Sequence, residues 1–465
     1  MKTKKLILFL IFILIITSGF QCTATKKVIN KPLKLVVWGV YEDRDALDIL
    51  FNKFSKIYPT ITLEYKKFTA EEYEDQLLNA WADDKGPDIY FLPNSSILQY
   101  KEKGRIIPMP ASAKLPHREI KTTGIGSLKK TDIIDSIKNI TLTSKNDLDL
   151  KFASVVGDDV YIDNKIYGLP LSLETLAMFY NRNFLNNAGI PHPPIVWADD
   201  KNSDDFVDQV KKITKLKKDG SFEQSGTSLG TINNISNASD IIALFLMQAD
   251  TNFANTKNLI DFSTNKKIIT TAINFYNDFS NPIKDIYSWN KDQINSFEAF
   301  KGGQTAFFFG YPYHKDQIPQ QINYGITTIP QLQYQISQNG EVSPLNPVNI
   351  ANYWVMTVSH KTKNSDIAWG FIDFATRKEN VKEYLEKSEK PTALRDLIKE
   401  QSKNIKLAPF VNQILSAKSW YRGTSPELAK RYLEELTDKI KKAETDRDIN
   451  AIIESYQSKI NQTIK

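Results

Sequence analysis

Apolar residues follow two different periods along the first stretch of the chain that is long enough to fold. Leu33–Trp38 is a nearly continuous apolar run, which is the pattern of a strand buried on both faces. Between residues 47 and 57 the apolar positions recur at helical spacing, and residues 61–67 then alternate as a strand does. A second helical stripe runs from Tyr73 to Trp81, before a short apolar run over 88–92. The pattern predicts a βαβαβ unit with a parallel sheet and right-handed crossovers.

The alternation of strand and helix patterns continues to the end of the chain. Further strands are predicted at 176–180, 306–309 and 354–358. Helices are predicted at 206–213, 241–247, 268–279, 367–374, 433–440 and 449–460. No internal repeat is visible, which argues against solenoids and propellers. The sequence therefore predicts an α/β protein.

The first 22 residues have the layout of a secretion signal. Lysines at positions 2, 4 and 5 precede the apolar run Leu6–Ile16, and small and polar residues follow it. The run is shorter than the roughly 20 apolar residues of a membrane-spanning helix. If the apolar segment is counted through Phe20, an uncleaved membrane anchor remains an alternative. No later segment of the sequence has the composition of a membrane span.

The single cysteine, Cys22, directly follows this segment. Its place suggests lipid attachment, although Gly19 and Gln21 depart from the usual lipobox. We expect a signal at 1–22, lipidation at Cys22, a polar tether at 23–32 and a location at the outer face of the cytoplasmic membrane. The alternatives are an incidental cysteine near the cleavage site or an uncleaved anchor.

Composition and charge narrow the possible functions. The chain has 465 residues, of which 41% are hydrophobic and 25% charged, and this composition is typical of well-packed globular domains. The length indicates two or three such domains. The net charge of +6 is spread along the chain without a basic block, which argues against nucleic-acid binding. One cysteine excludes an internal disulfide and a cysteine-rich zinc site.

The motifs of several enzyme classes are missing. The sequence has no phosphate-binding glycine loop, no dinucleotide fingerprint and no G-x-S-x-G. The four histidines stand far apart, so we expect neither a metal nor a cofactor. A glycosidase needs only two suitably spaced carboxylates, and 54 acidic residues offer many, so this class stays a rival.

Several segments together resemble the carbohydrate-type extracellular solute-binding proteins of ABC importers, a group that includes maltose-binding protein. They are LVVWGVYEDRD, GPDIYFLPNSSILQYKEKGRIIPM, NKIYGLPLSLETLAMFYNRNFLNNAGI, AFKGGQTAFFFGYPY, YGITTIPQ and NYWVMTVSHKTKNSDIAWGFIDFAT. Their order and spacing, which extend over most of the exported chain, carry the resemblance.

The resemblance implies a periplasmic-binding-protein-like type II fold, in which two hinge-connected lobes, each a sheet flanked by helices, enclose a ligand cleft. We place lobe one at 33–173 plus 331–390 and lobe two at 174–330 plus 391–465. It also implies a monomer that captures a small hydrophilic ligand, in this family a sugar or oligosaccharide, and delivers it to an ABC transporter permease. The segment 165–171 leads into the crossing between the lobes. A hinge there would accommodate the backbone rotation that accompanies closure of the lobes.

The resemblance further implies which residues line the cleft. From lobe one these are Tyr41, Glu42, Asn94, Ser95 and Trp354, and Glu174 lies at the crossing between the lobes. From lobe two they are Asn233, Asn234, Tyr311, Tyr313, Arg395 and Trp420. Tyr311 and Tyr313 follow a strand as two exposed-looking rings, and a sugar cleft combines such aromatic platforms with carboxylates and amides. Leu92 and Pro93 replace an aromatic common in maltose-binding relatives, which weakens the case for maltodextrin.

Alternative interpretations accompany these expectations. The chain has 7 Trp, 20 Tyr and 25 Phe, so core packing is the alternative for each named ring. We expect Trp38, Trp81, Trp197, Trp289 and Trp369 mainly to pack in the core, and among them Trp38 also borders the binding loop. For the whole protein, the rivals are a secreted carbohydrate-active enzyme and an envelope adhesin or scaffold built on the same fold.

Overall fold

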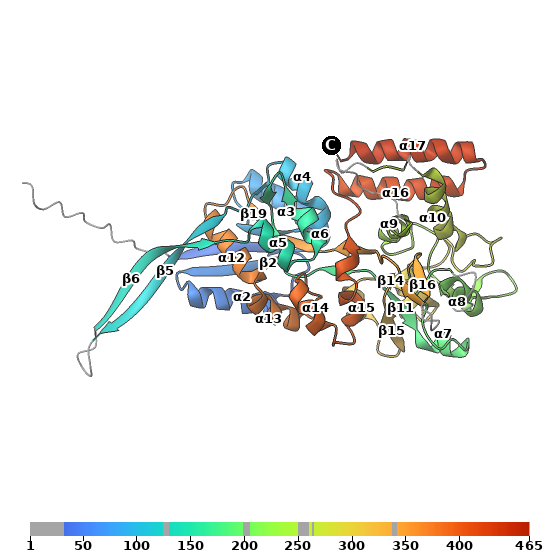
Figure 1. Cartoon of the computed structure of the whole chain (residues 1–465), viewed down its shortest axis with the longest axis horizontal. Helices are drawn as coiled ribbons and strands as arrows, with labels where there is room; N and C mark the ends of the chain where they lie inside the picture. The colour runs from blue at the N-terminus through green and yellow to red at the C-terminus, as the bar shows by residue number, and fades with distance from the viewer. Residues whose placement is uncertain are drawn as a thin grey trace, which may run out of the picture.

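Two large hydrophobic cores organise the chain, and a third, smaller cluster contains residues between 177 and 318 together with Phe410. The computed structural model describes residues 32–123, 130–198, 205–249, 260–262, 265–336 and 342–464. One core is built mainly from residues 35–173 and 351–417, and the other from residues 176–350 and 420–464. Figure 1 shows these two bodies end to end along the long axis of the molecule. We call the first lobe 1 and the second lobe 2.

The sheet of lobe 1 contains the predicted βαβαβ unit. Its strand order is β2-β1-β3-β19-β4, and β1 pairs in parallel with both β2 and β3. The strands are β1 (Leu33–Gly39), β2 (Ile61–Lys67), β3 (Ile89–Pro93), β4 (Ile106–Ile107), β9 (Leu169–Pro170) and β19 (Trp354–Ser359). Helices α2 (Arg44–Ile57), α3 (Ala70–Ala82), α12 (Ser365–Thr376) and α13 (Lys378–Ser388) complete the lobe's main framework. The Thr69 and Glu72 side chains cap the start of α3 reciprocally, which is why this helix begins where it does.

The sheet of lobe 2 has the order β12-β13-β14-β11-β15. Its strands are β11 (Ala177–Asn181), β12 (Lys215–Leu216), β13 (Phe222–Thr227), β14 (Thr305–Gly310) and β15 (Tyr324–Thr327). Every position of β14 is buried, as its continuous apolar pattern predicted. The surrounding helices are α8 (Phe206–Ile213), α9 (Ala238–Gln248), α10 (Lys266–Asp278), α11 (Ser296–Lys301), α16 (Pro426–Lys441) and α17 (Asp446–Gln462). All strands and helices predicted from the sequence are confirmed, with bounds that differ by a few residues.

A small three-stranded sheet joins the two lobes. It has the order β10-β18-β20, from β10 (Glu174–Thr175), β18 (Asn349–Asn352) and β20 (Ala417–Lys418). Each of these strands has lobe 1 core residues on one side in sequence and lobe 2 core residues on the other. The chain therefore crosses between the lobes three times, side by side.

Two of the crossings fall later in the chain than the lobe boundaries that we expected. The first crossing begins at Glu174, but the second lies at 349–352 and not at 330/331, and the third at 417–418 and not at 390/391. Leu394, Leu397 and Val411 pack in the lobe 1 core, and Val348 in that of lobe 2. Crossing strands of two to four residues are too short for a hydrophobic period, so the sequence pattern could not locate them.

A long hairpin, for which the sequence pattern predicted no strand, projects from lobe 1 (Figure 1). Its strands, β5 (Ser112–Thr123) and β6 (Lys130–Thr141), pair with each other in a two-stranded sheet. Ala113 and Leu115 near its base are buried against the lobe 1 core, whereas Ile120 and Ile133 farther out are exposed. The hairpin thus lacks the clean apolar alternation of a half-buried strand.

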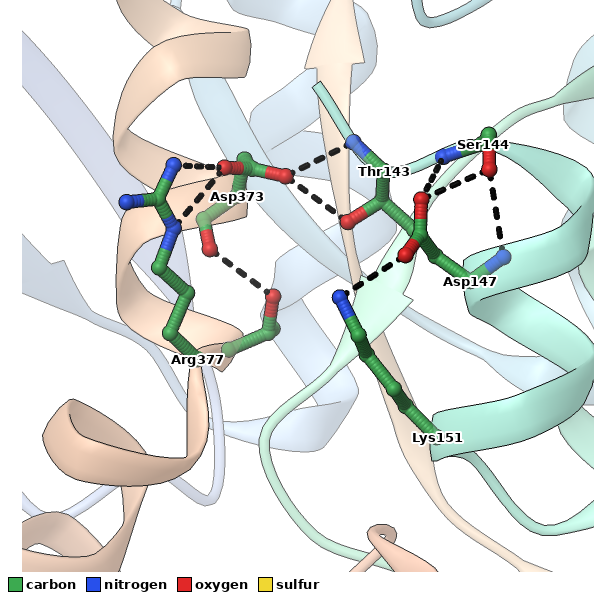
Figure 2. Close-up of polar contacts among 7 residues, drawn as sticks. Thr143, Ser144, Asp147, Lys151, Asp373 and Arg377 are labelled. Atoms are coloured by element: carbon green, nitrogen blue, oxygen red, sulfur yellow. Dashed lines mark hydrogen bonds and ion pairs between the residues drawn. The ribbon is translucent and has the colours of Figure 1, made fainter. Parts of the chain in front are cut away.

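Polar contacts fix the base of this hairpin to α12. The Asp373 carboxylate accepts hydrogen bonds from the Thr143 backbone at 2.8 Å and hydroxyl at 2.7 Å, and Arg377 Nη2 lies 2.7 Å from its other oxygen. Figure 2 shows this group beside the capping box of Ser144 and Asp147. Asp373 is buried, whereas the Arg377 side chain is 46% exposed, so only the carboxylate side of the ion pair is shielded from solvent.

The remaining elements are short. They are η1 (Asn94–Ser96), α4 (Ile97–Glu102), α5 (Lys145–Lys151), α6 (Ser154–Val160), β7 (Tyr161–Ile162), β8 (Lys165–Ile166), α7 (Arg182–Asn187), η3 (Pro312–Gln317), β16 (Tyr334–Ile336), β17 (Val342–Pro344), α14 (Arg395–Gln401), α15 (Ala408–Val411) and η4 (Ile414–Ser416). The expected signal segment 1–22 with Cys22, and residues 23–31 of the expected tether, lie outside the described residues. Among the described helices, none combines the length and apolar character needed to cross a bilayer.

Candidate functional site

The carboxyl edge of the lobe 1 sheet presents two aromatic rings. Tyr41 follows β1 and is 56% exposed, and its ring meets that of Trp354 edge-on with 5.3 Å between centroids. Trp354 begins β19 and pairs with Pro93 at the end of β3. Because ligands of open α/β sheets bind beyond the carboxyl ends of parallel strands, these rings occupy a suitable edge.

Glu42, the residue after Tyr41, is only 3% exposed and makes contacts inside the protein. Its carboxylate accepts a hydrogen bond from the Tyr384 hydroxyl and lies 3.1 Å from the ammonium of Lys390. Lys390 Nζ also reaches the Tyr41 carbonyl oxygen at 3.3 Å. Glu42 therefore positions the loop that carries Tyr41, and both of these contacts go to the same carboxylate oxygen, Oε2.

A buried carboxylate, Asp159 on α6, connects the two lobes beside Asn94. It accepts hydrogen bonds from the Asn94 amide at 3.1 Å, the Tyr353 hydroxyl at 2.6 Å and the Ser419 hydroxyl at 2.6 Å. Arg422 Nε lies 2.7 Å from its other oxygen. Asp159 belongs to lobe 1, whereas Arg422 follows the lobe 2 core residues at 420 and 421. The group acts as a polar bridge next to the crossing strands.

In lobe 2, the two tyrosines after β14 have different environments. Tyr313 is 45% exposed, and its ring stacks on His314 with 4.2 Å between centroids. Tyr311 is fully buried, which corrects the expectation of two exposed rings. The Tyr311 hydroxyl donates to Asp240 Oδ2 at 2.7 Å, and Trp420 Nε1 donates to Asp240 Oδ1 at 3.3 Å. Asp240 thus joins two candidate residues that are far apart in sequence.

Glu174 lies on the first crossing strand, opposite Asn352 of β18. Burial raises the pKa of its carboxyl to about 7, with opposing contributions from the Lys390 and Lys315 charges and a further increase from Glu42. The pKa of the Tyr313 phenol is also raised, first by burial and then by the negative charges of Glu174 and Asp240. The electrostatic contacts therefore link Glu174 to groups of both lobes.

Three expected residues have other roles or places. The Asn234 amide donates to the carbonyl oxygens of Asn290 and Gln293, both at 2.9 Å, so it holds loops of lobe 2 together. Asn233 lines a separate groove of lobe 2. The Arg395 guanidinium donates to the Phe152 carbonyl oxygen at 2.6 Å within lobe 1, although we had placed it in lobe 2. The corrected third crossing explains this difference.

The tryptophans expected in the core are confirmed there. Trp81 is 3% exposed, and Trp197, Trp289 and Trp369 are fully buried. Trp38, which we expected to border the binding loop, is also buried, with its ring 4.6 Å from that of Phe68.

Small pockets lie at the boundary between the lobes. One, of about 60 Å³, is lined by Asn94, Ser95, Asp240, Ala351, Asn352, Ser419, Trp420, Tyr421, Pro426 and Lys430. Another, of about 210 Å³, is lined by Asn94, Ser95, Leu98, Asp158, Asp159, Tyr161, Ile162, Asp163 and Arg422. Aromatic rings, carboxylates and amides at one boundary suit a ligand that has both apolar faces and hydroxyl groups.

The sequence analysis missed Asp159, Asp240, Lys315, Lys390, Ser419 and Arg422. One signal was available for Asp159, because at helical spacing it shares a face with Val155 and Val156, and a carboxylate on an apolar face needs partners. Within the described ranges, no group of three or more His, Cys, Asp or Glu side chains could hold a metal ion.

Comparison with known proteins agrees with this architecture. Residues 50–409 match the family described as bacterial extracellular solute-binding protein. A galactooligosaccharide-binding protein of Bacillus subtilis is 22% identical over 386 residues, which cover 82% of this chain and 77% of the relative. By name, this relative is a binding protein and not an enzyme.

Solved structures share the fold. The cyclic alpha-maltosyl-1,6-maltose binding protein of Arthrobacter globiformis superposes with a TM-score of 0.67 at 16% identity, covering 93% of this chain and 99% of the other. An ABC transporter solute-binding protein of Thermotoga lettingae, bound with alpha-D-tagatose, superposes with a TM-score of 0.63 at 16% identity, covering 93% and 100%. With its two-lobed α/β fold and a family match over residues 50–409, the chain belongs to the bacterial extracellular solute-binding proteins.

Proposed function

We propose that this protein captures a sugar or oligosaccharide at the boundary between its lobes and delivers it to the permease of an ABC transporter. The observation that carries this proposal is the pair of exposed rings, Tyr41 on lobe 1 and Tyr313 on lobe 2, together with Glu174 on the first crossing strand. Glu174 and Tyr41 both contribute to the raised pKa of the Tyr313 phenol, which indicates that both groups lie near it. The sugar-binding relatives support the ligand class.

The proposed mechanism involves no bond making. The three crossing strands act as the hinge, and a ligand that contacts both lobes favours the closed arrangement because it gains contacts only there. The permease then recognises the closed shape. The proposal includes a monomer that functions outside the cytoplasm, attached by lipid at Cys22 to the outer face of the membrane.

A glycosidase has one observation in its favour, the raised pKa of Glu174, which would suit a general acid. A second carboxylate would have to serve as nucleophile or base. Glu42, whose charge acts on Glu174, is held by Tyr384 and Lys390 and is only 3% exposed. The binding function therefore accounts for the site better than catalysis does.

A thermal-shift screen tests the proposal. The chain from residue 23 onward contains every residue of both cores, so it is the form to use. The panel contains mono- and oligosaccharides, polyols, nucleosides, amino acids and short peptides. A ligand at a hundred times its Kd adds about 2.7 kcal/mol to the free energy of unfolding, which gives a clear rise in Tm.

The outcomes separate the candidate functions. Stabilisation by a sugar that is recovered intact supports the proposal, whereas recovery of a cleaved product supports the enzyme. Stabilisation by amino acids or peptides alone would show that the ligand class is wrong. If no small molecule changes the Tm, an adhesin or scaffold is favoured.

A further inference from the structure

The outer part of the hairpin β5–β6 presents a row of exposed apolar side chains. In the register of the ribbon, Ile120 lies opposite Ile133 and Pro116 lies opposite Ile137, so the four side chains share one face. Ile120, Ile133 and Ile137 are 64%, 54% and 51% exposed. Single exposed apolar residues are ordinary, but several on one projecting ribbon indicate an interaction surface. We call these four residues the isoleucine face.

The charges around the isoleucine face favour an anionic partner. Arg118 and Asp135 lie between its residues, and they form an ion pair at 2.7 Å that leaves no net charge there. Over β5 and β6 as a whole, the sequence has five Lys or Arg residues and three Asp or Glu residues. This positive excess repels a second copy of the same ribbon and attracts an anionic surface.

The hairpin leaves lobe 1 at the end away from lobe 2 (Figure 1). Its base runs along α12 from the end of the helix toward its start, because the Thr143 backbone donates to Asp373 whereas the Lys114 backbone donates to Asp366. Helix α12 starts shortly after β19, at the amino edge of the parallel strands. The ribbon beyond Lys114 therefore extends past the edge of the sheet opposite to that of Tyr41.

The start of the folded chain lies at the same end of lobe 1. Strand β1 begins at Leu33 and leads to Tyr41, so its start lies about 20 Å from the edge that carries Tyr41. The expected tether, 23–32, spans at most about 35 Å when fully extended. The hairpin strands of 12 residues are about 40 Å long. With Cys22 attached to the membrane, a tether of this length keeps the hairpin within reach of the lipid surface.

We propose that the isoleucine face binds the anionic phospholipid surface of the membrane. The orientation rests on the lipid attachment at Cys22 in the proposed function, whereas the binding itself depends only on the hairpin. Lobe 1 then faces the lipid, and the boundary between the lobes lies farther out, where solutes arrive. The hairpin adds a basic and apolar contact to that of the lipid, and such contacts act together in holding a protein on a bilayer.

The backbone of the hairpin limits how deeply it enters the bilayer. In the described chain, β5 and β6 pair only with each other, so the outer edge of each strand has backbone groups without a strand partner. Such groups are costly in hydrocarbon, where no water can satisfy them. The ribbon therefore lies in the headgroup layer, with the isoleucine side chains toward the acyl chains and the lysines near lipid phosphates.

Sedimentation with large unilamellar vesicles tests this inference. The protein is the chain from residue 23 onward, so that no lipid at Cys22 contributes. The vesicles consist of phosphatidylcholine alone or of phosphatidylcholine mixed with phosphatidylglycerol. We expect the partition coefficient to be at least tenfold higher with the anionic mixture. The double variant Ile120→Thr with Ile133→Thr should lower that coefficient at least tenfold, because it removes apolar contact but keeps β-branched side chains that suit a strand.

The matched control is the double variant Ile283→Thr with Ile405→Thr, which changes two isoleucines outside the hairpin that are 88% and 89% exposed. It should change the partition coefficient less than twofold. Both double variants should keep the Tm and the sugar affinity of the unmodified chain, since the altered side chains are exposed and lie outside the candidate site.

Three results would overturn the inference. The first is that the unmodified chain does not sediment with anionic vesicles, and the second is that the hairpin variant and the control have equal partition coefficients. The third is a dimer in light scattering that the hairpin variant abolishes, which would show that a second copy covers the face. Sugar capture is tested separately by the calorimetric Kd, so its failure would leave the vesicle result intact.

Discussion

Tyr311 and Tyr313 are two residues apart, yet only one of them presents its ring to solvent. The Tyr311 hydroxyl is committed to Asp240, and its ring lies 6.1 Å from that of Tyr313 at an interplanar angle of 22°. Tyr311 thus supports the exposed ring from behind. An aromatic platform of this kind contributes mainly by its face, and such contacts are worth about 0.5–1.5 kcal/mol beyond the area buried.

We therefore predict that Tyr313→Ala weakens binding of the sugar identified by the screen about tenfold, while Tyr313→Phe changes it by less than threefold. The phenylalanine keeps the ring face and loses only the hydroxyl. Calorimetric Kd values at constant pH measure the effect. Equal losses for the two variants would show that the hydroxyl, and not the ring face, carries the contact.

Glu174 gives the protein a pH dependence with a defined sign. Its pKa is about 7 in the folded protein and near 4.5 ordinarily, because burial disfavours the charged form. Below pH 4.5 the carboxyl is protonated in the folded and unfolded states alike. As the pH rises through 7, the folded protein must ionise a buried group, so this residue's contribution to stability is lost.

The variant Glu174→Gln should consequently gain stability relative to the unmodified protein as the pH rises from 4.5 to 8. The gain is on the order of 1–3 kcal/mol in the free energy of unfolding. Urea unfolding of both proteins at several pH values measures it. A constant difference between the two proteins over this range would contradict the raised pKa.

At the scale of elements, two glycines of lobe 1 show how packing decides what the backbone tolerates. Gly168 lies against β19, and a Cβ there would be 2.4 Å from Val355 Cγ1 and 2.7 Å from the Met356 carbonyl oxygen. Gly157 lies inside helix α6, where the nearest atom to a new Cβ is 3.4 Å away. Neither residue has a positive φ, so steric room alone distinguishes them.

Gly168→Ala should lower the free energy of unfolding by about 1–3 kcal/mol, because overpacking displaces β19. Gly157→Ala should raise it by up to ~1 kcal/mol, because alanine favours the helix. Chemical unfolding of the two variants compares them directly. If both variants changed stability in the same direction, the contact at β19 would not be the deciding factor.

The hairpin β5–β6, which the sequence analysis did not predict, shows where hydrophobic periodicity no longer identifies a strand. Ile120, Ile133 and Ile137 are all more than half exposed, and an ion pair of Arg118 with Asp135, at 2.7 Å, lies among them on the same face of the ribbon. Strand prediction depends on one buried face. The outer part of this two-stranded ribbon has none among the described residues, and its sequence carries no strand signal.

At the scale of the whole molecule, Asp159 and Arg422 connect the lobes beside the hinge. The Asp159 side chain is 1% exposed and that of Arg422 is 22% exposed, so the pair is shielded on one side. Removing one partner of such a pair leaves a buried charge and costs about 3–5 kcal/mol. The bridge also limits how far the lobes can separate.

We predict that Arg422→Met lowers the free energy of unfolding by a few kcal/mol and increases the radius of gyration of the ligand-free protein. Small-angle scattering measures the second effect. Arg118→Met is the matched control, because its partner Asp135 lies in the hairpin and joins no lobes. An equal radius for both variants would show that the Asp159 bridge does not hold the lobes together.

Local periodicity in the sequence determined the α/β class, the βαβαβ unit and many of the longer strands and helices of both lobes, because burial of one face imposes a pattern within a few neighbouring residues. Only the tertiary structure decided the three crossings and the composition of the candidate site. Glu42 meets Lys390, and Asp240 meets Trp420, across long separations in sequence. Such pairings arise from how the elements pack against one another. The sequence around a charged residue has no periodic pattern that would identify its distant partner. The sequence could therefore name Tyr41, Glu174 and Tyr313 as candidates, but not the buried contacts that position them.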